Sequence, residues 1–283
     1  MDVMVGRFAA QLVRPNTTKF AWPAVLLPEL FATQVHLRVA AGYLASLGWE
    51  VYVPDLRPAA VPAVASALGR IRFADTLALA EEMLAALGRD AVVLGHGIGG
   101  LLALKLAERA HVRAGVAFAP LAPGFRSPLF IRAGNLLPMW RRYPLRPPVG
   151  RMLFELMADA EPFQRDQLIQ ALTPGAAALA LDVARGEVAF ARGESAAPRL
   201  IVAGDSDIFA PHHRVERFAA SIGAKFVTLA GRGHWIIAGR ALERAINETQ
   251  RFLVRALGQE LLLLYPDEFR PGESPAADGE DDS

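Results

Sequence analysis

The chain has 283 residues, of which 53% are hydrophobic and 21% are charged, and its formal net charge is +1. This length and composition are those of a globular protein of one large or two small domains, and no apolar run reaches the roughly 18–20 residues that span a bilayer. Because the N-terminus lacks the apolar core of a secretory signal and there is no cysteine for disulfides, thiol chemistry or metal binding, we expect a cytoplasmic bacterial protein.

Short runs rich in valine and isoleucine alternate with longer segments of helical period. In chain order, the pattern predicts a strand at 24–28, a helix at 34–47, a strand at 49–55, a helix at 73–87, a strand at 90–95, a helix at 98–110, strands at 112–120 and 198–205, a helix at 211–222, a strand at 224–230 and a helix at 239–258. Residues 5–20 give a weaker signal for edge strands. Strands that are apolar on both faces and alternate with helices predict an α/β fold with a mostly parallel, doubly covered sheet.

Residues 121–197 interrupt this alternation, because they contain no clear strand pattern and many prolines. A segment of this length is too long for a connection between two core strands, so we predict a helical cap. The core is then formed by 1–120 and 198–265. Residues 266–283 carry seven acidic residues and one arginine, and this composition predicts a disordered tail.

The predicted cap is basic over 126–151, where it has no acidic residue. Its arginines there are Arg126, Arg132, Arg141, Arg142, Arg146 and Arg151. Aromatic and aliphatic residues lie between them, which is typical of an amphipathic lid with a solvated basic face. A second interpretation is a lid that contacts an anionic acyl ligand or, weakly, an anionic membrane surface. No base-reading module accompanies the arginines, so we do not expect a nucleic-acid partner.

The stretch Gly95-His96-Gly97-Ile98-Gly99-Gly100 follows a predicted strand and precedes a predicted helix. A glycine-rich turn in this position is the setting of a nucleophile elbow, whose apex carries the reactive side chain. Here the apex residue is Gly97. Asp207 follows a later strand and His234 follows the last strand, so the chain order is elbow, acid, base.

In VLGHGIGGLLALKLAE, VYVPDLRP, LIVAGDSDIFAP and GRGHW, the chain resembles the α/β-hydrolase superfamily of capped serine esterases and lipases over about residues 20–258. The resemblance implies a nucleophile at position 97, an acid at Asp207 and a base at His234. Members of the family carry serine at the elbow. Gly97 accepts the positive φ of that turn, but without an Oγ no acyl-enzyme can form.

A second departure from the family lies after the first core strand, where a His-Gly pair is usual and this chain has Pro28-Glu29. Proline removes an N–H group, and a carboxylate at Glu29 would repel a developing oxyanion. Each oxyanion donor contributes about 3–4 kcal/mol to catalysis, so these changes point away from ordinary esterase chemistry. The N–H groups of Leu30 and Ile98 remain candidate donors. We also expect Trp235, next to the candidate base, to form part of the pocket wall.

Together these departures predict a pseudoenzyme that lacks ordinary serine-hydrolase activity and binds a small apolar or acyl ligand under the cap. One alternative is an enzyme of hydrolase or lyase type that needs no cofactor and uses the Asp207–His234 dyad as a general base. Another is an esterase or lipase in which a laboratory substitution replaced serine by Gly97. A third is an interaction protein that docks through its cap or tail.

We predict no cofactor and no metal site. The adjacent His212 and His213 cannot both face one metal ion from a helix, and we expect them to lie in its first turn after Pro211. His96 is expected to be structural, and Asp205 is expected to be a turn residue rather than the acid of the site.

Overall fold

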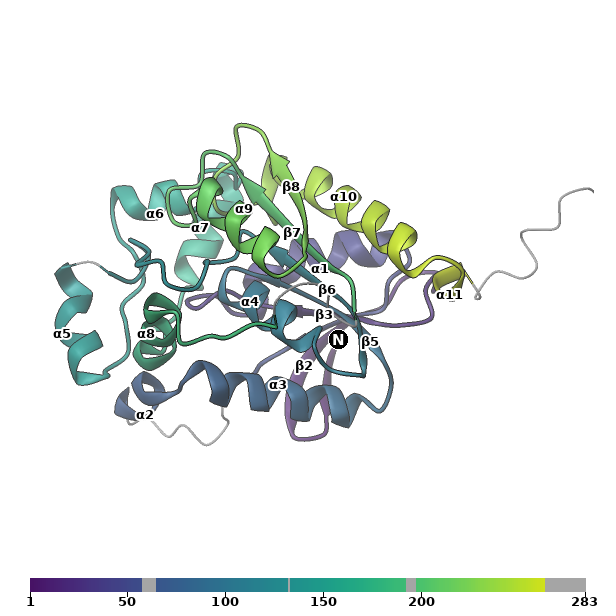
Figure 1. Ribbon diagram of the computed structural model, residues 1–283, viewed down its shortest axis with the longest axis horizontal. Helices are drawn as coiled ribbons and strands as arrows, with labels where there is room; N and C mark the ends of the chain where they lie inside the picture. The colour runs from purple at the N-terminus through teal and green to yellow at the C-terminus, as the bar shows by residue number, and fades with distance from the viewer. Residues whose placement is uncertain (58–64, 132, 192–196, 263–283) are drawn as a thin grey trace, which may run out of the picture.

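The computed structural model describes residues 1–57, 65–131, 133–191 and 197–262. Within these residues the chain forms an eight-stranded sheet with the order β1-β2-β4-β3-β5-β6-β7-β8 (Figure 1). The strands are β1 (Asp2–Val5), β2 (Phe8–Val13), β3 (Ala24–Leu27), β4 (Val51–Pro54), β5 (Ala91–His96), β6 (Val112–Phe118), β7 (Arg199–Gly204) and β8 (Lys225–Leu229).

The pairing of the strands confirms the predicted mostly parallel sheet. Strands β3 to β8 pair in parallel, whereas β1 and β2 form an antiparallel hairpin that joins the sheet at β4. The hairpin accounts for the weaker signal near the N-terminus. In β2 the residues alternate between buried and more exposed positions, because this antiparallel end of the sheet is covered more fully on one face than on the other.

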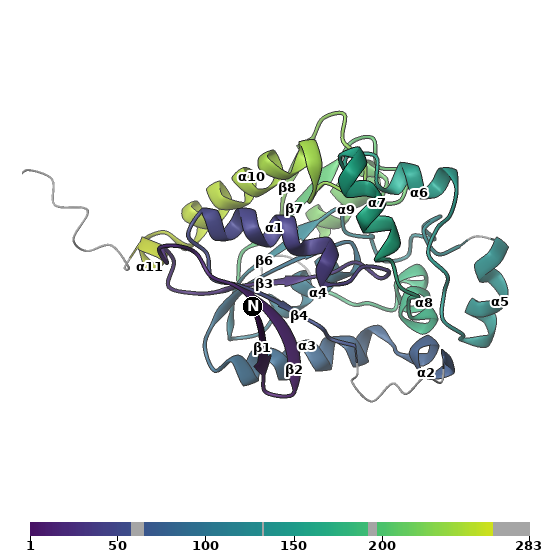
Figure 2. The same cartoon turned by 180° about the vertical axis from the view of Figure 1, so that it is seen from behind.

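Helices cover both faces of the sheet, as predicted (Figures 1 and 2). On one face lie α1 (Gln34–Ser46) and α10 (Gly239–Leu257), and on the other lie α3 (Phe73–Leu87), α4 (Ile98–Leu106) and α9 (His212–Ser221). Helix α4 ends earlier than predicted, because the N–H of Arg109 turns back to the carbonyl of Leu106 at 2.9 Å. Pro211 is the N-cap of α9 rather than a residue of its first turn.

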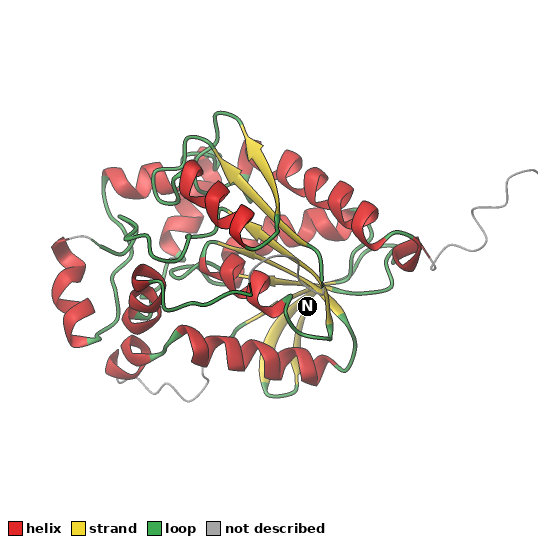
Figure 3. Ribbon diagram, viewed as in Figure 1, coloured by secondary structure: helices red, strands yellow, loops and turns green. Residues whose placement is uncertain are grey.

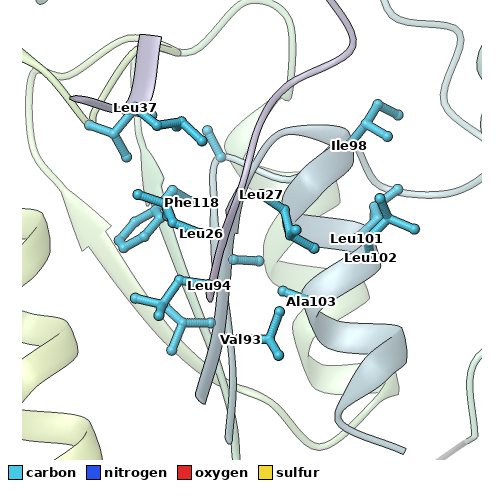
Figure 4. Close-up of a cluster of buried hydrophobic side chains, with 14 of the residues drawn as sticks. Leu26, Leu27, Leu37, Val93, Leu94, Ile98, Leu101, Leu102, Ala103 and Phe118 are labelled. Carbon is cyan, nitrogen blue, oxygen red and sulfur yellow. The ribbon is translucent and has the colours of Figure 1, made fainter. Parts of the chain in front are cut away.

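The central strands are held by apolar contacts on both of their faces, as the close-up of this core shows (Figure 4). Leu27 and Val93 point toward α4, while Leu26 and Leu94 point to the opposite face, toward Leu37 of α1. All five side chains are fully buried. This packing fixes the carboxyl ends of β3 and β5, where the candidate site lies.

Among the described residues between β6 and β7 there are four helices, which lie at the end of the molecule away from α11 (Gln259–Leu262) (Figure 3). They are α5 (Ala133–Arg141), α6 (Arg151–Leu156), α7 (Pro162–Gln170) and α8 (Ala177–Arg185), and a further short helix, α2 (Ala65–Arg70), packs against α8. Pro138 lies inside α5, so the prolines do not all separate helices as expected.

The predicted tail (266–283) and Arg132 lie outside the described residues. In the described part of the chain, each helix is too short or too polar to cross a bilayer.

Candidate functional site

The glycine-rich turn between β5 and α4 has the backbone of an elbow. Gly97 has φ 52° and ψ −113°, a conformation that a residue with a Cβ adopts only under strain. At Gly99 an added Cβ would collide with the carbonyl oxygens of Leu27 and Pro28. Glycine there lets the first turn of α4 approach the end of β3, and this approach assembles the site.

Glu29 lies at the end of β3, and its carboxylate is turned inward and fully buried. One oxygen, Oε1, accepts the N–H of Leu30 at 2.7 Å. The other, Oε2, accepts the N–H of Ile98 at 3.1 Å, at the N-terminus of α4, where the helix dipole also favours a negative charge. The two N–H groups predicted as oxyanion donors therefore converge, and they converge on a carboxylate of the protein itself.

The Glu29 carboxylate also takes the place of a side chain at position 97. A Cβ added to Gly97 would fall on Glu29 Oε2, far inside van der Waals contact. The two departures from the family pattern, far apart in sequence, are thus one arrangement: the glutamate fits because the elbow residue is glycine.

Asp207 and His234 meet as the chain order implies. Asp207 Oδ2 lies 2.7 Å from Nδ1 of His234, and Oδ1 accepts the N–H groups of Phe209 at 2.7 Å and Ala210 at 2.9 Å. The other ring nitrogen of His234, Nε2, lies 3.7 Å from Glu29 Oε2. All three ionisable side chains are buried, so the imidazole stands between two carboxylates.

This arrangement charges His234. Burial opposes its protonation, but the charges of Asp207 and Glu29 and the hydrogen bond to Asp207 outweigh burial and raise the pKa of His234 to about 10. His96 lies beside it, and burial together with the nearby positive charge holds the pKa of His96 well below its usual value. His96 Nε2 donates to the carbonyl of His234 at 2.9 Å, which is the structural role expected for it.

We expect His234 to make the protein less stable as the pH rises above neutrality. Its pKa is about 10 in the folded protein and about 6.5 in an unfolded chain. Its stabilising contribution is therefore complete below pH 6.5 and is lost between pH 6.5 and 10, with a slope of up to about 1.4 kcal/mol per pH unit. Urea unfolding across this range measures the slope, which His234→Gln should remove. Identical slopes for both proteins would contradict the charged state.

Two other predicted positions have simple structural roles. Asp205 accepts the N–H of Gly231 at 2.7 Å and holds a turn, as expected. The prediction for Trp235 needs correction, because its ring is buried in the core, with its centroid 4.6 Å from that of His96 and 5.7 Å from that of His36. Trp235 is not among the residues that line the cavity beside Glu29.

That cavity has a volume of about 100 Å³ and is lined in part by residues 173–176 and 179, from the segment between β6 and β7. Leu30 and Ile98 line it, together with Ala176, the N-cap of α8, and Leu179 of α8. Further apolar side chains complete the walls, namely Leu27, Leu56, Leu68, Ile71 and Leu102. The sequence analysis missed these wall residues, because the apolar period of α8 or α4 does not show which residues face a cavity and which face the core.

Glu29, His96 and His234 have the donor atoms of a metal site, and one such atom from each lies within 4.8 Å of the others. Ligands of a tetrahedral zinc ion lie about 3.3 Å apart, so these atoms would have to draw closer. The carboxylate oxygens already accept backbone N–H groups, and His96 already donates to a carbonyl. These hydrogen bonds compete with an ion for the carboxylate oxygens and for Nε2 of His96, whereas Nδ1 of His96 and Nε2 of His234 have no hydrogen-bond partner in the described part of the chain.

A model of the alpha/beta hydrolase family matches residues 16–246. The chain belongs to this family. The match confirms the predicted resemblance and fold class. It covers β3 to β8, the segment between β6 and β7 and the loops that carry Asp207 and His234.

Solved structures share the fold of this α/β-hydrolase. A monoacylglycerol lipase from Paleococcus ferrophilus is 18% identical, with a TM-score of 0.65, over 87% of this chain and 99% of that one. A thermophilic esterase from Thermogutta terrifontis is 19% identical, with a TM-score of 0.63, over 88% of this chain and 94% of that one. A serine hydrolase from Cycloclasticus zankles is 13% identical, with a TM-score of 0.63, over 91% and 98%. No curated protein matches the chain in sequence.

Proposed function

We propose that this α/β-hydrolase has no serine-hydrolase activity and binds a small neutral apolar ligand in the cavity beside Glu29. The observation that carries the proposal is the position of the Glu29 carboxylate. It accepts both N–H groups that an oxyanion would need and fills the space of a side chain at position 97. An ester in the cavity would meet neither a nucleophile nor free donors, and its developing negative charge would face a carboxylate.

The walls of the cavity favour a neutral ligand. They are mostly aliphatic, and the charged groups at the rim are already matched: Glu29 by two N–H groups, and Asp55 by Arg57 at 2.8 and 2.6 Å. A carboxylate ligand would have to break the ion pair of Arg57 to find a partner. The volume of about 100 Å³ is of the order of an apolar cavity that takes up benzene, about 150 Å³.

The charge of His234 weighs against a general-base enzyme. A general base must be unprotonated at the working pH, whereas the pKa of about 10 keeps His234 protonated near neutrality. The fit between Gly97 and Glu29 weighs against a laboratory substitution of an active serine. A serine could not stand at position 97 with Glu29 where it is, so a form with an active serine would need Glu29 in a different position.

Benzene and indole serve as probes of the cavity. We expect either to raise the thermal midpoint in a concentration-dependent way, because a ligand that binds only the folded state stabilises it. Ala176→Leu narrows the cavity and should weaken this binding at least tenfold, whereas Ala220→Leu, at an exposed position of α9, should not. Turnover of p-nitrophenyl acetate at esterase rates, or equal binding by both variants, would overturn the proposal.

A further inference from the structure

The cap carries a group of exposed apolar side chains, which we call the cap surface. Its members come from α5, α6, α7 and the loops beside them, and they are Leu136, Leu137, Trp140, Tyr143, Val149, Phe154 and Phe163. Figures 1 and 2 place α5 and α6 at the same end of the molecule, away from the long helix α10. An exposed apolar group of this kind on one end of a protein indicates an interaction site.

Helix α5 shows most clearly that these residues do not serve the core. It buries Asn135 and Met139 on its inner side, while Leu136, Leu137 and Trp140 face solvent. Trp140 has 76% of its surface exposed, although it is among the most apolar residues of the segment. The outer side of α5 is therefore the more apolar one, opposite to the usual pattern of a surface helix.

The charge around these residues is positive. The sequence has no acidic residue between Arg109 and Phe154, and the guanidinium of Arg141 lies 5.2 Å from the ring centre of Trp140. In the described part of the chain, Arg141 and Arg142 have no ion pair. The nearest acids in sequence, Glu155 and Asp159, are already 3.5 Å from arginine nitrogens.

We infer that the cap surface docks on the surface of an anionic lipid bilayer. Tryptophan and leucine side chains enter the region between headgroups and acyl chains, and arginines beside them bind anionic headgroups. A second copy of the chain fits the surface less well, because a symmetric contact would place the same arginines against each other. This inference goes beyond the proposed ligand site and does not depend on it.

Sedimentation of the full chain with vesicles tests the inference. We expect binding to vesicles with 30% phosphatidylglycerol in phosphatidylcholine at least tenfold stronger than to phosphatidylcholine alone, with weakening in 0.5 M salt. The fluorescence of Trp140 should shift to the blue on binding. Trp49 and Trp235 are fully buried and Trp22 is partly buried, so Trp140 dominates such a shift.

Paired variants separate the contribution of the arginine charges to vesicle binding from that of the apolar side chains. Arg141→Gln/Arg142→Gln should weaken binding to the anionic vesicles by about fivefold per arginine, whereas Arg244→Gln/Arg255→Gln, at exposed positions of α10, should weaken it much less. Leu137→Ser/Trp140→Ser should abolish binding, and the exposed pair Val35→Ser/Val39→Ser of α1 should retain it. Thermal midpoints check that each variant is folded.

Three results would overturn the inference. The first is equal binding to neutral and anionic vesicles, and the second is equal loss in the cap and control pairs. The third is a dimer, seen by light scattering, that Leu137→Ser/Trp140→Ser dissociates while vesicle binding is absent, because the cap surface would then be a contact between copies of the chain.

Discussion

Gly97→Ser is expected to lower the free energy of unfolding by about 3 kcal/mol and to produce no esterase. The serine Cβ would fall on Glu29 Oε2, and such overpacking costs about 1–3 kcal/mol. A residue with a Cβ at φ 52° adds strain of about 1–3 kcal/mol. Even where the chain adjusts, the carboxylate remains close to the N–H groups of Leu30 and Ile98, so an oxyanion finds no free donors.

Gly88→Ser separates strain from overlap. Gly88 has φ 71°, but the space around its missing Cβ is open. The free energy of unfolding of this variant is therefore lowered only by its strained backbone conformation. We expect Gly97→Ser to be clearly the less stable of the two in urea unfolding at pH 7. Equal stabilities would show that the Glu29 side chain gives way at little cost, and that its position does not exclude a nucleophile.

The double variant Glu29→Gly/Gly97→Ser tests whether Glu29 is the group that excludes a serine at position 97. Removing the carboxylate frees the N–H groups of Leu30 and Ile98 and leaves room for a serine hydroxyl beside His234. We therefore expect the double variant to be more stable than Gly97→Ser alone and to hydrolyse p-nitrophenyl acetate. A double variant that is less stable than the sum of its single changes would contradict the coupling between positions 29 and 97.

Asp207→Ala is expected to lower the free energy of unfolding by about 3–5 kcal/mol, because it removes one partner of a buried ion pair. It also leaves the N–H groups of Phe209 and Ala210 without their acceptor. Asp207→Asn keeps an acceptor oxygen and loses only the charge, so we expect a smaller loss and a lower pKa of His234 by NMR titration.

Ser206→Ala is the matched control for Asp207→Ala. Ser206 is exposed and its hydroxyl donates to the neighbouring Asp205 at 3.0 Å, so the change should cost less than about 0.5 kcal/mol. If Asp207→Ala and Ser206→Ala have similar unfolding free energies, the buried charges of Asp207, His234 and Glu29 contribute little to the stability of the fold.

Periodicity and turn chemistry were enough to predict the sheet and its covering helices. The elbow glycines, Asp207 and His234 could also be placed, because strand ends in a parallel sheet meet at one edge. The inward turn of Glu29 could not be predicted. It depends on how closely α4 approaches the end of β3, a distance set by the packing of segments far apart in the chain.

Trp235 is a residue whose position in the sequence predicted the wrong surroundings. Its place next to His234 suggested the pocket, but adjacent residues in a loop can point in opposite directions, and the ring packs against His96 in the core. Pro138 inside α5 is a further example. Proline lowers the tendency to form a helix, yet packing against neighbouring segments such as α8 decides whether the helix forms.

The overlap between position 97 and Glu29 also has a consequence for ancestry. In any ancestor with a serine at the elbow, a glutamate at position 29 could not have settled into its present place, because the Cβ of that serine would have stood there. Glycine at 97, by contrast, is compatible with the inward glutamate at 29 and with the residue that preceded it there. The loss of the nucleophile therefore came before the gain of the inward glutamate or together with it, and a return to catalysis would have to undo the two changes in the reverse order.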